Sequence, residues 1–254
     1  MDIVLTNDDG IESPGLRALY EALDGVGDVT AVAPARDMSA TGRALSREVA
    51  VDEHELGYAV HGTPSDCVVA GLEQLAPDAD LVVSGCNRGG NLGMYVLGRS
   101  GTVSAAVEAA FFGVPAIASS LALTSEDFES GETPKADYEE AARATAYLAE
   151  NAFGDGVFEH ADYLNVNAPR PGTETGELHV TTPTHGYDMT VERAGDHLQL
   201  ADRMWRRIDE GLVADEPADS DVRAVVEGRT SVSPLTAPHT AEHHEYLDEL
   251  ARAY

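Results

Sequence analysis

The stretch MDIVLTNDDG, residues 1–10, decides the fold class of this chain. Its apolar and partly β-branched run, Ile3 to Leu5, ends at a turn cluster, which predicts a buried strand over residues 2–6. Asp8 and Asp9 follow where this strand ends. Adjacent carboxylates repel each other, so a fold that places them together usually supplies a cation or strong hydrogen-bond donors. A solvated turn is the alternative interpretation, because Asn, Asp and Gly are ordinary turn residues.

Strand and helix patterns alternate after this first strand. Ser13 and Pro14 predict an N-cap and a first helical residue, with apolar residues at helical spacing behind them. We expect further strands at residues 28–34, 80–85 and 115–120, a helix that opens at Thr63 and Pro64, and a helix over about 103–112 that buries Val103, Val107, Ala110 and Phe111. Such alternation predicts a parallel sheet with helices on both faces.

The second half of the chain is less regular. A helix is predicted around residues 136–151, and DYLNVNAP at 162–169 is typical of a strand. Short strands and turns follow from about 170 to 235, and a last helix is predicted over about 241–252. We therefore expect a single α/β domain over 1–254, in which a Rossmann-like core over about 1–125 continues into a mixed α/β segment over 126–254.

The composition excludes several classes of partner. The formal net charge is −29, and Lys135 is the only lysine. Nucleic acids and anionic membranes would be repelled by so negative a surface, so neither is expected as a partner. The charge is spread along the whole sequence, which resembles proteins of organisms that keep molar salt in the cytoplasm.

Cysteine usage and hydropathy predict a soluble, cytoplasmic protein. Cys67 and Cys86 are the only cysteines and form no CxxC motif, which favours a reducing compartment. The sequence contains no basic segment followed by an apolar stretch at its start, and no run of about 18 apolar residues.

Three of the predicted strands lead into unusual polar loops, which carry Asp8 with Asp9, Ser39, and Asn87 with Asn91. In an open parallel sheet, ligands bind at the carboxyl ends of the strands, near the point where strand order reverses. Two carboxylates, a hydroxyl and an amide oxygen form an all-oxygen set. Such a set suits one hard divalent ion, Mg²⁺ or Mn²⁺, and does not suit zinc, which favours His and Cys.

A second candidate feature is GRSGTVSAA at 98–106, a turn that enters a helix. Free backbone N–H groups and the helix dipole make such a turn an anion site, and Ser100 and Thr102 add hydroxyl donors. Plain N-capping by the same residues is the alternative. A metal pocket beside a phosphate cradle indicates phosphoryl chemistry.

These motifs resemble those of the SurE family, the stationary-phase survival protein E and its 5′/3′-nucleotidase relatives. The resemblance covers essentially the whole chain and rests on six segments in the family's order and spacing: MDIVLTNDDGIESPGLRAL, AVAPARDMS, HGTPSDCV, LVVSGCNRGGNLG, SGTVSAAVEA and SVSPLT. It implies a three-layer α/β/α fold with a C-terminal hairpin and helix extension that is exchanged between subunits of a homodimer or homotetramer.

The resemblance also implies a metal-dependent phosphatase that acts on nucleoside monophosphates. One divalent ion per subunit would be bound by Asp8, Asp9, Ser39 and Asn87, and the phosphate site would be lined by Asn91, Ser100, Gly101 and Thr102. Four residues depart from the common family pattern without removing a ligand: Glu12, Ser13, Ala35 and Arg99. Arg99 precedes the SGT segment and bears on the choice of substrate.

The sequence leaves the mechanism open between an activated water and attack by Asp8 or Asp9, with either aspartate also a candidate base. A haloacid dehalogenase-type phosphatase is one alternative, but Asn7, Asp8 and Asp9 do not give the Asp-x-Asp which that class needs. A non-catalytic nucleotide-binding module is another, although a pure phosphate binder gains nothing from two carboxylates without a metal. Two further candidates carry less weight. His185 could lie on the substrate side, but we favour a structural role. His239 and His243 are spaced to chelate a metal, but we favour a solvated face.

Overall fold

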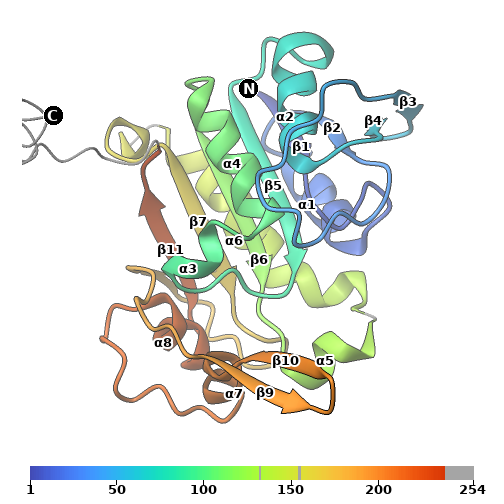
Figure 1. The fold of residues 1–254 in the computed structure, drawn as a ribbon. Coiled ribbons are helices and arrows are strands. Elements are labelled where there is room, and N and C mark those ends of the chain that lie inside the picture. Colours follow the sequence, from blue (N-terminus) through green and yellow to red (C-terminus); the bar gives the residue numbers. More distant parts are fainter. Residues whose placement is uncertain (132, 154–155, 238–254) are drawn as a thin grey trace, which may run out of the picture.

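The computed structural model describes residues 1–131, 133–153 and 156–237, which form an α/β/α fold (Figure 1). Its first elements are β1 (Asp2–Thr6), α1 (Pro14–Leu23), β2 (Asp28–Pro34), β3 (Val51–His54), β4 (Gly57–Val60), α2 (Pro64–Ala70), β5 (Leu81–Arg88), α3 (Met94–Leu97), α4 (Gly101–Phe111) and β6 (Ala116–Leu121). The chain continues with α5 (Ser125–Ser130), α6 (Glu139–Asn151), β7 (Tyr163–Ala168), β8 (Leu178–Val180), β9 (Met189–Ala194), β10 (His197–Asp202), α7 (Arg203–Asp209), α8 (Asp221–Val226) and β11 (Thr230–Leu235).

Nine strands form the central sheet, in the order β3-β4-β2-β1-β5-β6-β7-β11-β8. The expected parallel sheet is confirmed for the central strands, whereas β3 pairs antiparallel with β4 and β11 antiparallel with β7. The chain passes from β1 to β2 on one side and later returns to β5 on the other. Strand order therefore reverses between β1 and β5, which opens a crevice at their carboxyl ends.

Alternating residues of β1 divide the core between the two faces of the sheet. Ile3 and Leu5 pack in one apolar cluster with residues of α1 and α6, whereas Val4 packs in another with residues of α2 and α4. The expected helix 103–112 corresponds to α4 and buries Val103, whereas Val107 and Ala110 are only partly buried and the predicted burial of Phe111 is wrong. Phe111 is 51% exposed, because it lies at the end of α4 and turns away from the sheet.

The second half adds strands to the same sheet and a small group of elements beyond it. Figure 1 shows α5, α7 and the β9–β10 hairpin grouped past the carboxyl end of β5. Helices α7 and α8 were not expected between 170 and 235, because six or seven residues are too few to show a helical period. The predicted helix over 241–252 and the pair His239 and His243 lie outside the described residues.

Candidate active site

The loop after β1 is held by the side chain of Asn7. Its Nδ2 donates to the carbonyl of Gly10 at 2.9 Å and to Oγ of Ser13 at 2.7 Å, and its Oδ1 accepts from the N–H of Gly10 at 3.1 Å. Ser13 is the N-cap of α1, as expected. The turn is therefore tied to the start of the next helix. Asp8 and Asp9, which lie between Asn7 and Ser13, face the crevice.

Asp8 is almost completely buried against the start of α4. Its Oδ1 accepts a hydrogen bond from Oγ1 of Thr102 at 2.5 Å. Gly101 packs directly on it, since a β-carbon at position 101 would stand 2.8 Å from Cβ and Oδ2 of Asp8. Burial raises the pKa of the Asp8 carboxyl, and the hydrogen bond from Thr102 offsets part of this rise.

Asp9 accepts a hydrogen bond at Oδ2 from the backbone N–H of Arg88, at 3.0 Å. Burial, followed by the charge of Asp8, raises the pKa of the Asp9 carboxyl from 3.8 to about 7. The Arg88 guanidinium points elsewhere and donates to Oγ1 of Thr133 and to the carbonyls of Asp127 and Phe128. Among the described residues it forms no ion pair with Asp8 or Asp9, and its charge offsets only a small part of the rise in the pKa of Asp9.

This arrangement fits a divalent cation. Within residues 1–131, 133–153 and 156–237, no ion pair includes Asp8 or Asp9. Two adjacent, mostly buried carboxylates without a cation are unfavourable, and a bound ion would neutralise both charges. The oxygen atoms around them are the ligand type that Mg²⁺ and Mn²⁺ prefer.

Ser39 lies in the loop after β2 and is held by a residue that the sequence did not single out. Asp37 Oδ1 accepts from both the N–H and Oγ of Ser39, at 2.7 and 2.6 Å. The N–H of Met38 donates to the carbonyl of Asp8 at 2.7 Å, which fastens this loop to the one after β1. Asp37 thus lines the same cavity as Asp8 and Asp9, although the described residues contain no group of three His, Cys, Asp or Glu side chains close enough to hold a metal ion. Its signal in the sequence was its place in the AVAPARDMS segment.

Asn87 lies within β5, two residues beyond the end of the predicted strand. The pairing of β5 with β6 shifts register between Ser84 and Asn87, and the strand then continues to Arg88. Nδ2 of Asn87 donates to the carbonyl of Gly89 at 2.6 Å. The amide nitrogen is thereby engaged, which makes the amide oxygen the atom suited to a cation.

Asn91 is clamped by buried polar residues of β6 and β7. Its N–H donates to Oδ1 of Asn167 at 2.7 Å, and its carbonyl accepts from Nδ2 of Asn165 at 2.9 Å. Its own Nδ2 donates to Oγ of Ser120 at 2.9 Å. These three partners were not predicted as site residues, because their link to Asn91 depends on which strands are neighbours in the sheet.

The expected phosphate residues divide into two groups. Asn91 and Ser100 line the main cavity, and Oγ of Ser100 caps α4 by accepting from the N–H of Val103 at 3.1 Å. Gly101 and Thr102 do not line it, since both are buried against Asp8. In this structure both residues support the Asp8 carboxylate.

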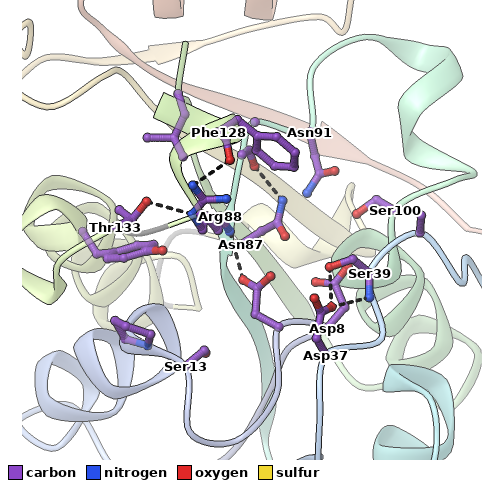
Figure 2. Close-up of a pocket in the computed structure, with 18 of the residues that line it drawn as sticks. Asp8, Ser13, Asp37, Ser39, Asn87, Arg88, Asn91, Ser100, Phe128 and Thr133 are labelled. Atoms are coloured by element: carbon purple, nitrogen blue, oxygen red, sulfur yellow. Dashed lines mark hydrogen bonds between the residues drawn. The ribbon is translucent and has the colours of Figure 1, made fainter. Parts of the chain in front are cut away.

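A cavity of about 1430 Å³ joins these residues. Figure 2 shows Asp8, Asp37 and Ser39 on one side, Asn87 near the centre, and Phe128 with Thr133 across from the acidic group. The volume exceeds the roughly 300–1,000 Å³ of ordinary ligand pockets and leaves room for a nucleotide. His185 lies in a separate cleft of about 390 Å³ instead.

Comparison with known proteins agrees with the motifs. The family model "Survival protein SurE" matches residues 3–189. The chain belongs to the SurE family. A protein of Halobacterium salinarum named "5′-nucleotidase SurE" is 62% identical, covering 100% of this chain and 98% of its own. One of the same name from Natronomonas pharaonis is 60% identical, with 100% of both chains covered.

The fold agrees with that of a solved SurE structure. The crystal structure of the SurE protein of Aquifex aeolicus matches with a TM-score of 0.78 and 31% identity, over 100% of this chain and 99% of that one. Both the family and the resemblance to halophilic members are thereby confirmed. No helix in the described parts of this SurE chain is long and apolar enough to cross a membrane.

Two residues that depart from the common SurE pattern have visible roles. Glu12 forms an ion pair with Arg17 at 2.8 Å and a hydrogen bond with Nε2 of His54 at 3.0 Å, which join the start of α1 to β3. Arg99 lines the cavity directly before Ser100, with its guanidinium 5.4 Å from the ring centroid of Tyr95. Arg99 is therefore placed where a substrate anion would meet a positive charge.

Proposed function

We propose that this protein is a divalent-metal-dependent phosphomonoesterase that hydrolyses nucleoside 5′-monophosphates to nucleoside and phosphate, with 3′-monophosphates as the second candidate substrate. The observation that carries the proposal is the pair Asp8 and Asp9, mostly buried and without an ion-pair partner among the described residues, beside the start of α4. The halophilic relatives named "5′-nucleotidase SurE" support the same activity.

The candidate ligands of one Mg²⁺ or Mn²⁺ ion per subunit are Asp8, Asp9, Ser39 and Asn87. When bound, the ion would draw charge from the phosphate oxygens and lower the pKa of a bound water molecule toward neutral. Asp37 orients Ser39 through two hydrogen bonds. The ligand set therefore comes from three separate loops or strand ends, each tied to its neighbour by hydrogen bonds.

The remaining residues would orient the phosphate. Ser100 lines the cavity at the start of α4, where the helix dipole favours an anion. Asn91 faces the same cavity from its clamped position, and Arg99 adds a positive charge at its wall. An aspartate that takes a proton from water and an aspartate that attacks phosphorus are both compatible with this arrangement, so we propose the hydrolysis without choosing between them.

The direct test is phosphate release from a panel of nucleoside monophosphates. We expect turnover with added Mn²⁺ or Mg²⁺, its loss in excess EDTA, and its return when metal is restored. A non-catalytic nucleotide-binding module would bind the same nucleotides and release no phosphate. Full activity in excess EDTA would contradict the metal-dependent reaction.

We also propose that the chain assembles as a homodimer or homotetramer through its second half. The β9–β10 hairpin forms a two-stranded sheet of its own, and Val191, Leu198 and Leu200 are between 56% and 68% exposed. Val191 pairs with Leu200, and Leu198 is two residues away on the same face. A lone hairpin with an exposed apolar face is marginally stable, which supports its use in subunit contacts.

The proposed location is the cytoplasm. Cys67 and Cys86 are buried free thiols, which is compatible with a reducing compartment. With a formal charge of −29, the surface is unsuited to duplex nucleic acid or anionic lipid. The proposed partners are therefore a nucleoside monophosphate, a divalent ion and further copies of the same chain.

A further inference from the structure

Phe128 is a large aromatic residue on the wall of a cavity that combines acidic and amide groups with apolar and aromatic side chains, Tyr138 and Trp205 among them. It belongs to α5, lines the cavity that contains Asp8 and Asp9, and is 54% exposed. Figure 2 shows it on the opposite side of Asn87 from Asp8 and Asp37. An aromatic side chain in such a position offers a flat apolar surface to the aromatic part of a ligand.

The ring rests on the strand end that carries Asn87. A β-carbon at position 89 would stand 3.2 Å from Cε2 and 3.4 Å from Cδ2 of Phe128, and Gly89 has a φ of +119°. A side chain at this position would be strained and would push the ring away. Glycine therefore allows Phe128 to lie directly on the backbone next to a candidate metal ligand.

Arg88 connects the same ring to the carboxylate site. Its guanidinium lies 5.1 Å from the ring centroid of Phe128, and Nη2 donates to the carbonyls of Asp127 and Phe128 at 2.7 and 2.9 Å. Its backbone N–H donates to Asp9. Arg88 therefore contacts the aromatic ring through its side chain and Asp9 through its backbone.

Helix α5 is also attached at its beginning. The N–H and Oγ of Ser125 donate to the carboxylate of Asp209 on α7, with Oγ at 2.5 Å. Trp205, the only tryptophan, lines the same cavity from α7. Both ends of α5 are therefore held, which keeps Phe128 in place before any ligand binds.

We propose that Phe128 is the platform on which the nucleotide base stacks while the phosphate lies at Asn91 and Ser100. This inference rests on the proposed function and extends it to the substrate class. Every base has a π-face, so stacking on one aromatic ring accepts purines and pyrimidines alike. The site contributes affinity for any nucleoside monophosphate, and the larger purines gain most from the contact.

The test compares adenosine 5′-monophosphate with ribose 5-phosphate, which has the same phosphate ester and no base. In Phe128→Ala, we expect the KM for the nucleotide to rise by about 5- to 100-fold, which corresponds to the loss of one base–aromatic contact. The KM for ribose 5-phosphate should stay unchanged. Phe128→Tyr should retain the wild-type values, because it keeps the ring.

Phe111→Ala is the matched control. Phe111 is 51% exposed, has the Arg43 guanidinium 4.4 Å from its ring centroid, and does not line the cavity. Its loss should leave both KM values unchanged. An equal rise of both KM values in Phe128→Ala, or no rise in either, would overturn the stacking role.

Equilibrium binding separates this inference from the proposed hydrolysis. Dialysis of adenosine 5′-monophosphate against wild-type protein and Phe128→Ala, with Mn²⁺ and in EDTA, needs no turnover. We expect weaker binding by the variant in both conditions, even if the wild-type protein releases no phosphate. Wild-type protein that binds the nucleotide no better than ribose 5-phosphate would overturn the inference, whatever the activity assay shows.

Discussion

The two halves of the central sheet place their polar residues differently. In the half built from β1, β2 and β5, the polar residues lie at or just beyond strand ends and face the cavity, as with Asp8 and Asn87. In the half built from β7 and β11, Asn165 and Asn167 lie inside a strand and are completely buried. The first half therefore presents ligand groups, and the second half supports them from behind.

The region around β1 and the β9–β10 hairpin also differ in how their apolar surface is covered. Around β1, helices on both faces close two large apolar clusters. The β9–β10 hairpin pairs with no strand of the central sheet and leaves Val191, Leu198 and Leu200 exposed. The regular half is complete as a single chain, whereas the hairpin has the composition of a surface that a second chain would cover.

The largest expected effect is loss of turnover in Asp8→Asn or Asp9→Asn. The loss should exceed the roughly 10- to 100-fold that removal of an outer partner costs, because a charged candidate ligand disappears. The melting temperature of the metal-free protein should not fall, since one of two repelling charges is removed.

Asp196→Asn, in the turn of the β9–β10 hairpin, is the control and should keep wild-type activity. If phosphate release by Asp8→Asn and Asp9→Asn matched the wild-type rate, the assignment of ligand groups to the first half would be wrong.

The supporting role of the second half predicts a smaller effect. In Asn167→Ala, Asn91 loses the acceptor of its N–H, and kcat/KM should fall by about 10- to 100-fold, as for outer partners of metal ligands. Unfolding should become easier by about 1–3 kcal/mol, because a buried donor is left without its partner. Steady-state kinetics and thermal melting measure the two effects.

Asn151→Ala, at the exposed end of α6, should change neither quantity. Unchanged kinetics in Asn167→Ala would contradict the proposal that the second half of the sheet positions the ligand-binding residues.

The uncovered hairpin predicts a change in mass. Light scattering in molar salt should give at least about twice the 26.8 kDa of one chain, because the apolar face of the hairpin is covered in a symmetric assembly. Leu200→Asp should lower the mass, since it puts a charge on that face. Truncation near Asn167 should lose both assembly and much of the stability, because it removes β11 from its pairing with β7. A wild-type mass of one chain at micromolar concentration would reject the assembly role.

Salt should produce the smallest effect, and it should act on both halves together. Acidic residues occur along the whole chain, so screening should stabilise the fold as KCl rises from about 0.1 to 3 M. We expect the melting temperature to rise by at least about 2–4 °C, the shift that about 1 kcal/mol produces in a chain of this size. Calorimetry should show one transition. Two transitions that respond differently to salt would show that the halves unfold separately.

Local signals in the sequence predicted most elements of the regular half but missed β3 and β4, two strands of four residues each. The strand before NDDG, the Ser13–Pro14 helix start and the later strands correspond to β1, α1, β2, β5 and β6. Capping and apolar periodicity depend on a few neighbouring residues, so they can be recognised in the sequence without knowledge of the fold. Helices α7 and α8 were missed because each has at most seven residues, which is too short to show an apolar period in the sequence.

The sequence by itself determined the fold class, the family and the residue types available for binding a metal and a phosphate. Only the tertiary structure decided that Thr102 supports Asp8, that Asn167 holds Asn91 from 76 residues away, and that Phe128 lies on Gly89. These contacts depend on the order and register of strands far apart in the chain. Short motifs report their own backbone conformation and charge, whereas the partner that a side chain meets is set by the packing of the whole sheet.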